Sequence, residues 1–250
     1  MLLIPAANPG PLTGAGNNTW LIDGREPTLI DAGVGHVEHL DAIDRALGGR
    51  ALARVLVTHG HTDHASGAPA IRTRWPGVEI RKMTLEGETG WPPIADGDRL
   101  RAGDEDLLAV HTPGHALDHM CFWDERTRDL YAGDMVALGT TIVVPGDRGG
   151  GMRAYLASLE RLAALRPARV YPGHGDVIDD PLGLITEYVA HRREREEQIV
   201  ACLSRGVADV DAIVARVYPD LAPALRPAAR ATVQAHLEKL RDEGRALPGT

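Results

Sequence analysis

The sequence predicts an α/β protein: an αββα sandwich, in which two mixed sheets lie face to face with helices outside, followed by a small winged-helix-like α domain. Short apolar runs typical of strands alternate with helical stretches rich in Ala, Leu and Arg, such as residues 152–165. Gly- and Pro-containing turns follow these runs. From about Leu184 the composition changes to a densely charged helical stretch. We therefore expect two domains, residues 1–184 and 185–250.

The first predicted elements are two paired strands, residues 17–22 and 27–33, joined near Gly24. After them the chain turns into a helix that runs to about Leu47. Asp31 stands at this turn, and its favoured role is to begin the helix as a capping residue; the alternative is a place close to the loop of residues 58–64. The next predicted strand is the apolar run Arg54–Val57.

Residues 58–64, directly after that strand, are the most informative stretch of the chain. They hold three imidazoles, His59, His61 and His64, and the carboxylate of Asp63. In an extended segment, side chains two apart point the same way, so His59 and His61 can hold one ion while Asp63 and His64, beyond the bend, face a second. Histidines rarely gather this densely by accident, so the stretch predicts a metal site.

Three later turns repeat the pattern of strand, tight turn and ligand-type side chain. His115, Asp134 and His174 each follow an apolar run and stand beside a glycine, so a sharp reversal can present each of them to a shared point. His119, four residues after His115, has two predicted functional roles: to donate to a substrate, or to hold a metal ligand in place through a hydrogen bond. The alternative to both is a buried structural histidine. His111 is expected to be structural.

With these residues the chain resembles the metallo-β-lactamase superfamily of hydrolases, whose His-x-His-x-Asp-His signature matches His59, His61, Asp63 and His64. The resemblance implies a dinuclear centre of two Zn²⁺ ions, or other divalent transition metals. It assigns His59, His61 and His115 to the first ion and Asp63, His64 and His174 to the second, with Asp134 between them. Dedicated β-lactamases commonly carry Cys at the bridging position, so Asp134 argues against that activity.

Two divalent ions that share Asp134 would also share a water molecule and lower its pKa to about 7 or below, which supplies a hydroxide nucleophile at neutral pH. The same ions would polarise a carbonyl or phosphoryl centre and stabilise its oxyanion. Asp63 is the predicted catalytic residue that orients the water and passes on its proton. His119 is the second predicted catalytic residue.

The C-terminal part contains three predicted helices, residues 185–203, 210–218 and 227–243, and a short wing-like tail at residues 244–247. This arrangement resembles the superfamily branch typified by β-lactamase-like protein 2, some members of which cleave single-stranded RNA. From residue 187 onward, ten Lys plus Arg balance ten Asp plus Glu, so the catalytic part carries the whole net charge of −8. Because nucleic-acid binders usually carry a basic excess, packing or a homodimer contact is the favoured role. Five basic residues could still form an RNA-binding side: Arg226, Arg230, Lys239, Arg241 and Arg245.

Several functions remain open at this stage. His174 follows Asp134 by only 40 positions, too few for the large inserted domain of the superfamily's mRNA-processing nucleases. A glyoxalase-type thioesterase also fits residues 112–115 with His119, although residues 135–144 differ from the glutathione-linked pattern. The favoured prediction is hydrolysis of a small ester, lactone or thioester. The alternatives are an endoribonuclease acting on single-stranded RNA and a non-catalytic DNA-binding regulator.

Composition agrees with an enzyme that has no membrane partner. No run approaches the roughly 20 apolar residues of a membrane span, and the N-terminal residues lack the basic start of a signal peptide. The two cysteines, Cys121 and Cys202, are too few for a disulfide framework, and we expect both to be buried and inert. The expected location is the cytoplasm.

Overall fold

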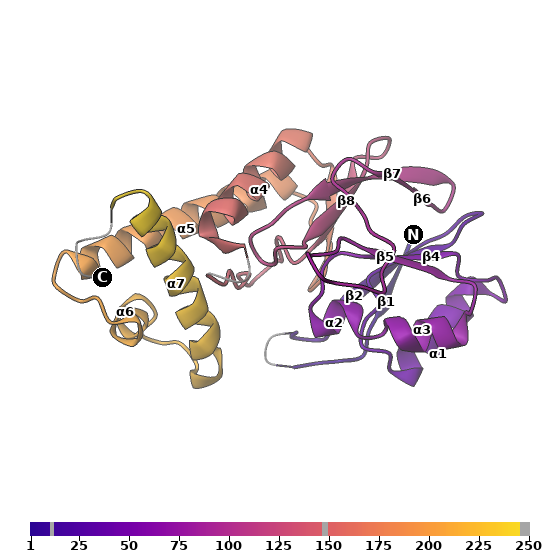
Figure 1. Ribbon diagram of the computed structural model, residues 1–250, viewed down its shortest axis with the longest axis horizontal. Helices are drawn as coiled ribbons and strands as arrows, with labels where there is room; N and C mark the ends of the chain where they lie inside the picture. The colour runs from indigo at the N-terminus through magenta and orange to yellow at the C-terminus, as the bar shows by residue number, and fades with distance from the viewer. Residues whose placement is uncertain (11–12, 147–149, 246–250) are drawn as a thin grey trace.

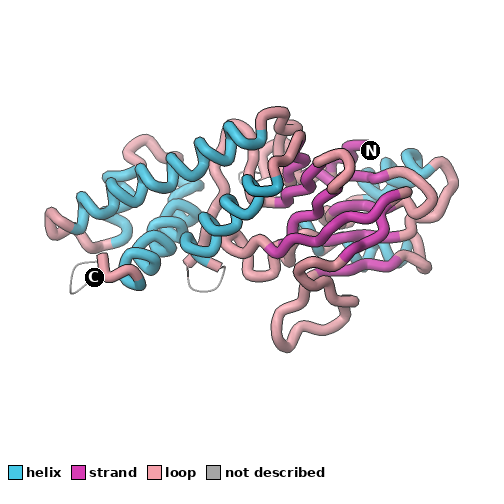
Figure 2. The backbone as a smooth tube through the Cα atoms, turned by 90° about the horizontal axis from the view of Figure 1, so that it is seen from above, coloured by secondary structure: helices cyan, strands magenta, loops and turns pink. Residues whose placement is uncertain are grey.

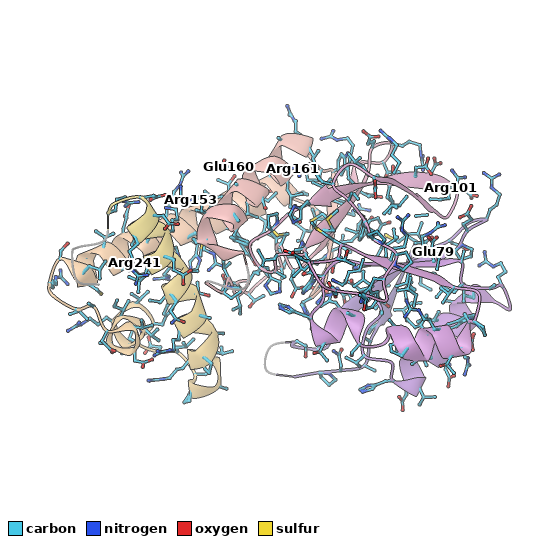
Figure 3. All side chains as sticks on the ribbon, in the orientation of Figure 1. Glu79, Arg101, Arg153, Glu160, Arg161 and Arg241 are labelled. Carbon is cyan, nitrogen blue, oxygen red and sulfur yellow. The ribbon has the colours of Figure 1, made fainter. Side chains whose placement is uncertain are left out.

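The computed structural model describes residues 1–10, 13–146 and 150–245 of the 250-residue chain. Two five-stranded sheets face each other, helices cover their outer faces, and a group of helices extends from one side of the sandwich (Figure 1). The predicted fold class, an αββα sandwich followed by a small helical domain, is confirmed. Side chains fill the space between the two sheets (Figure 3).

The first sheet has the strand order β1-β2-β3-β4-β5. The strands β1, β2 and β3 pair antiparallel, whereas β4 pairs parallel with both β3 and β5. Its members are β1 Leu2–Pro5, β2 Asn18–Ile22, β3 Thr28–Ile30, β4 Arg54–Val57 and β5 Glu79–Lys82. Helices α1 Val37–Leu47, α2 Thr62–Ala65 and α3 Ala68–Arg74 accompany this sheet.

The second sheet has the order β10-β9-β8-β7-β6 and is antiparallel except for the parallel pair of β9 and β10. Its strands are β6 Arg99–Ala102, β7 Glu105–His111, β8 Met120–Asp124, β9 Asp129–Gly133 and β10 Arg169–Pro172. Helices α4 Gly151–Leu165 and α5 Pro181–Leu203 run alongside each other next to this sheet (Figure 1). Both sheets are therefore mixed, as expected.

Alternation of side chains along the strands builds the layers. In β8, Phe122 points into the cluster between the sheets, where it joins Trp20 and Leu56, while Cys121 points out to the cluster beneath α4. In β4, Val55 faces the opposite side from Leu56, toward the helices that cover the first sheet. Because successive strand residues face opposite sides, the apolar runs of the sequence fill two layers each.

The helix α5 connects the sandwich to the C-terminal helices α6 Val210–Val217, η1 Pro223–Leu225 and α7 Arg226–Asp242, which Figure 2 shows grouped at one end of the molecule. Ile185 and Tyr188 of α5 pack in the core of the second sheet, whereas Ile199 and Leu203 pack with α6 and α7. The expected domain boundary at residues 184/185 stays a prediction, and a continuous helix runs through it.

The predicted role of Asp31 is wrong. The helix α1 begins at Val37 with His36 at its cap position, and Asp31 is buried several residues earlier. Cys121 and Cys202 are both free and buried, as expected, and burial raises the pKa of the Cys121 thiol to about 12. The predicted wing-like tail lies, from residue 246 onward, outside the described residues. No helix within the described ranges is long and apolar enough to cross a membrane.

Candidate metal centre

Four strand ends bring the predicted ligands together. Since β7 and β9 are both antiparallel to β8, and β10 is parallel to β9, the carboxyl ends of β7, β9 and β10 lie at one edge of the second sheet. The carboxyl end of β4 meets this edge, because the Met120 amide donates to the Thr58 carbonyl (2.7 Å). All seven residues predicted as ligands follow these four strands and lie within three overlapping groups of potential metal-binding atoms: His59, His61 and His115; His59, His64 and Asp134; Asp63, His64 and His174.

In the first group, three ring nitrogens point at one another. His61 Nδ1 lies 2.9 Å from His59 Nε2 and 2.9 Å from His115 Nε2. Nitrogens that are each about 2.0–2.1 Å from one ion lie about 2.9–3.4 Å apart, depending on coordination geometry. The three imidazoles therefore have the spacing of one shared ion.

The second group surrounds Asp63 and His174. His174 Nε2 lies 3.3 Å from Asp63 Oδ2, and His64 Nε2 lies 3.5 Å from the same oxygen. Asp134 stands between the groups: its Oδ1 is 3.4 Å from both His64 Nε2 and His174 Nε2, while its Oδ2 is 3.5 Å from His115 Nε2. One carboxylate thus presents one oxygen to each group.

Asp31, which the sequence interpretation assigned to helix initiation, orients two of the histidines through hydrogen bonds on the side of each ring away from the centre. Its buried carboxylate accepts from the Thr58 amide (2.7 Å) and hydroxyl (2.9 Å) and lies 2.8 Å from His64 Nδ1. The Thr58 hydroxyl in turn lies 3.0 Å from His59 Nδ1. Since the hydroxyl donates to Asp31, it accepts from His59, so both rings carry a proton on Nδ1 and turn Nε2, the atom that would bind an ion, toward the centre.

His115 is oriented by a backbone carbonyl. Its Nδ1 lies 2.7 Å from the oxygen of Val143, in the segment after Asp134. A carbonyl can only accept, so Nδ1 carries the proton and Nε2 is left free to bind an ion.

His119 is fully buried, and both of its ring nitrogens are engaged. Nε2 accepts from the backbone amide of Asp134 (3.1 Å), so Nδ1 carries the proton and donates to the Thr112 hydroxyl (2.8 Å). The first of the two roles predicted for His119, donation to a substrate, does not fit this geometry. The second role fits: the ring holds the backbone of Asp134 in position. His111, at the end of β7, bonds to the Leu117 carbonyl (2.8 Å), in keeping with a structural role.

The two groups differ in their electrostatics. Burial and the neighbouring imidazoles lower the pKa of His59 and His61, so these rings are neutral and can donate lone pairs. Burial opposes ionisation of Asp134, but facing histidines hold the pKa of its carboxyl well below the usual range. Burial likewise opposes protonation of His174, and the carboxylates of Asp134 and Asp63 outweigh it and raise the pKa of His174 to about 9.

The donor set fits a bound cation. His64 Nε2 and Asp134 Oδ1 are buried and have no hydrogen-bond partner within the described part of the chain. Buried polar atoms normally have a partner, and an ion between them would supply one. Gly173 permits the close approach, since a Cβ atom there would lie 2.5 Å from Asp134 Oδ1 and 2.8 Å from His64.

A pocket of about 410 Å³ opens beside the first group. His61 and Gly60 form one side of it, and the half-exposed side chains of Leu85 and Leu117 form apolar walls. Asp118 and Glu88 also line it, and both carboxylates bind the ammonium group of the buried Lys82, at 2.6 and 2.9 Å.

Two family models match the chain. The Metallo-beta-lactamase superfamily model matches residues 12–174, and the Beta-lactamase associated winged helix domain model matches residues 210–248. The first match covers more than half of the chain and includes every residue of the three metal-binding groups.

The chain is similar in sequence to relatives that carry different names. It is 32% identical over 249 residues to a Beta-lactamase-like protein 2 homolog of Caenorhabditis elegans, covering 95% of this chain and 82% of the relative. It is 33% identical over 208 residues to an Atrochrysone carboxyl ACP thioesterase of Claviceps purpurea (82% and 66%) and 36% identical over 215 residues to the Lactamase-like protein adaB of Aspergillus niger (85% and 66%). The chain thus spans 66% of the length of each of these two fungal relatives.

Solved structures share the fold. A metallo-beta-lactamase family protein from Thermus thermophilus superposes with a TM-score of 0.80 at 25% identity, covering 97% of this chain and 93% of that one. A second protein, solved in a di-iron-bound form, superposes with a TM-score of 0.60 at 25% identity and covers 75% of this chain and 98% of its own. On the family match, the identities and the fold, the chain belongs to the metallo-β-lactamase superfamily of hydrolases and carries the winged-helix domain associated with it.

Proposed function

We propose that this chain is a dinuclear zinc hydrolase whose substrate is a thioester. The observation that carries the proposal is the pair of ligand groups on either side of Asp134, next to a pocket with apolar walls. Imidazole nitrogens and carboxylate oxygens suit zinc, although iron and other divalent transition metals bind the same donors. The name of the Claviceps purpurea relative supports thioester chemistry.

We assign His59, His61 and His115 to the first ion, Asp63, His64 and His174 to the second, and Asp134 to both. Two ions held there would polarise the substrate carbonyl and make a water molecule acidic enough to ionise near neutral pH. Three other residues support the ligands through hydrogen bonds. Asp31 and Thr58 orient ligand rings, and His119 holds the Asp134 backbone.

Asp63 is the side chain of the second group best suited to handle protons. Its side chain is 24% exposed, about twice the exposure of Asp134 at 11%. In the proposed reaction Asp63 orients the attacking water and takes its proton. The water oxygen bonds to the acyl carbon, the carbon–sulfur bond breaks, and the proton passes to the departing thiolate, which leaves a carboxylic acid and a thiol.

The pocket beside His61 favours a neutral substrate over a polyanion. Leu85 and Leu117 offer apolar contact to an acyl chain, whereas the carboxylates of Asp118 and Glu88 outnumber the single ammonium of Lys82. The parts of a phosphodiester backbone that lie against Asp118 and Glu88 would meet net negative charge, even though bound ions would attract the reacting phosphoryl group.

Four of the five basic residues expected on the RNA-binding side of the C-terminal domain interact with other groups of the protein. Of the five basic residues expected on its RNA-binding side, Arg230 pairs with Asp211 (2.5 Å), and Lys239 and Arg245 pair with Glu196 (2.7 and 2.5 Å). Arg241 also has an interaction partner. Charge neutralised inside the protein cannot release counterions from RNA.

The test is a substrate panel with zinc-loaded protein: a short-chain acyl thioester of N-acetylcysteamine, its oxygen-ester analogue, a lactone, a single-stranded RNA oligonucleotide and a chromogenic phosphodiester. We expect thioester hydrolysis that disappears on chelation and in Asp63→Asn, with the RNA left intact. Asp106→Asn, at an exposed carboxylate near the amino end of β7, opposite the end that leads to the ligand His115, is the control and should keep full activity. RNA cleavage by protein that leaves every ester and thioester intact would overturn the proposal.

A further inference from the structure

The segment after Asp134 lacks regular structure of its own. Residues 134–146, which we call the 134–146 loop, contain neither helix nor strand. Yet the loop begins with the carboxylate between the two ligand groups and carries the Val143 carbonyl that orients His115. Its shape must therefore be set by contacts with the rest of the molecule.

One peptide unit of this loop connects a ligand to the C-terminal domain. The carbonyl of Val143 bonds to His115 Nδ1, and the amide of the same peptide unit, on Val144, donates to the Thr232 hydroxyl of α7 (3.3 Å). A peptide unit is planar, and its C=O and N–H point in opposite directions. A rotation that moves the N–H away from Thr232 therefore also moves the C=O away from His115. The plane is thus held between the His115 ring and α7.

The helix α5 holds the rest of the loop. The Tyr188 hydroxyl accepts from the Ala137 amide (3.0 Å) and lies 3.0 Å from the Thr140 carbonyl, and the Arg192 guanidinium donates to the Ile142 carbonyl. The Arg192 side chain is 1% exposed, and it lies over the ring of Tyr155. Such buried polar contacts favour one conformation of a segment without secondary structure.

Apolar packing runs through the same contact. Val136, Ile142 and Val144 of the loop share a buried cluster with Ile185 of α5 and Ala235 of α7. The C-terminal domain thus packs against this loop instead of standing apart on a linker.

We propose that Thr232, together with Tyr188 and Arg192, is a positioning residue for the metal centre: through the 134–146 loop it sets the orientation of His115. On this account the C-terminal domain is part of the support of the hydrolytic site. The inference rests on the proposed metal centre but not on the identity of the substrate.

The test measures metal affinity in the full-length chain. Thr232→Val removes the acceptor of the Val144 amide and keeps the side-chain shape, and Thr232→Ser restores the hydroxyl. Removing a residue that holds a ligand directly costs 10- to 100-fold in affinity, so Thr232, one bond further away, should cost about three- to tenfold. We expect this loss for one of the two zinc ions in competition with a chromogenic chelator, and a changed absorption spectrum of the cobalt-substituted protein. Thr232→Ser should restore both.

Thr186→Val is the matched control, because its exposed hydroxyl bonds within α5 to Leu182 (2.7 Å) and should leave both affinities unchanged. In a His115→Ala background, Thr232→Val should have no further effect on either ion. If Thr232→Val does not fold, Arg192→Lys provides the second variant, because Lys lacks the planar guanidinium that reaches Ile142.

A Thr232→Val protein that is less stable but binds both ions as tightly as the wild type would overturn the inference. That result leaves the proposed function intact. Conversely, a wild-type protein that binds two ions and hydrolyses no thioester would refute the proposed substrate. The positioning role of Thr232 would still be decided by the metal affinities of the Thr232 variants.

Discussion

Asp31→Asn is the most informative single substitution outside the ligands. The Asp31 carboxylate must accept from the Thr58 amide with one oxygen and from His64 Nδ1 with the other. Asn offers one acceptor and one donor in the same shape. If its oxygen stays on Thr58, its NH₂ group faces His64 Nδ1, which must then give up its proton. The His64 proton moves to Nε2, the atom that faces Asp134 and the proposed second ion.

The size of the effect follows from the hydrogen bond that is lost. A hydrogen bond to a charged group contributes about 1.5–3 kcal/mol, and each 1.4 kcal/mol changes an equilibrium constant about tenfold. Before the second ion can bind, the His64 proton must return from Nε2 to Nδ1, and this return costs the free energy of the lost hydrogen bond. We therefore expect the second ion to bind about 10- to 100-fold more weakly, in the range typical for residues that orient a metal ligand.

The assay is zinc titration of the metal-free variant against a chromogenic chelator, with thermal unfolding measured in parallel. Asp23→Asn is the control, because that carboxylate pairs with Arg50 at the surface. The reasoning fails if Asp31→Asn binds both ions with wild-type affinity. It also fails if the loss falls equally on both ions, since His64 is the one predicted ligand whose side chain Asp31 contacts directly within the described part of the chain.

Two further predictions concern stability. The His236 ring, whose Nδ1 lies 3.5 Å from Glu196, and hydrogen bonds from Lys239 and Arg245 lower the pKa of the buried Glu196 from 4.5 to about 2. This stabilisation is complete above pH 4.5 and is lost as the pH falls through 2. This pKa difference corresponds to about 3 kcal/mol, and solvent screening at the exposed Arg245 reduces it to about 1–2 kcal/mol. Glu196→Gln should therefore lower the free energy of unfolding at pH 7 by that amount and make it less dependent on pH below 4.5. An unchanged pH profile would contradict this. Gly114→Ala should lower the free energy of unfolding by about 2–4 kcal/mol, because φ is +144° and the new Cβ would lie 2.4 Å from Tyr155 Cα. Gly139→Ala, where φ is +69° and no atom lies near the new Cβ, should lower it by about 1 kcal/mol. Equal losses of stability in urea unfolding would refute the clash at Gly114.

The gathering of the seven predicted ligands could be predicted because each of them follows an apolar strand, at most seven residues after its end. His59 follows β4 and Asp134 follows β9, and strands that end at one edge bring such residues together whatever the details of packing. The layer order could also be predicted, since alternation along the strands reports which faces are covered. The starts of helices were less certain: α1 begins at Val37, several residues after the predicted turn.

The supporting residues could not be predicted, because their partners are distant in the chain. Asp31 contacts Thr58 and His64, 27 and 33 residues away, and nothing local distinguishes it from a capping residue. Thr232 meets Val144 across 88 residues and lies on a helix whose own pattern is that of an ordinary surface helix. For His119 the sequence left two roles open, and the choice between them depends on the burial of its ring and the amide of Asp134.

The homodimer and the cytoplasmic location stay predictions that independent measurements must test. Sedimentation of the metal-loaded protein over a range of concentrations addresses the first, and localisation of the tagged protein in its native cell addresses the second.

The central claim is that the two ligand groups flanking Asp134 hold two ions, and metal counting tests it most directly. Protein purified from zinc-supplemented medium and dialysed against metal-free buffer is analysed for all transition metals and for protein concentration. The account predicts close to two ions per chain in the wild type and a loss from both sites in Asp134→Ala, because that carboxylate presents one oxygen to each group. A wild-type content of one ion or none, or an Asp134→Ala protein that keeps both ions, would contradict it.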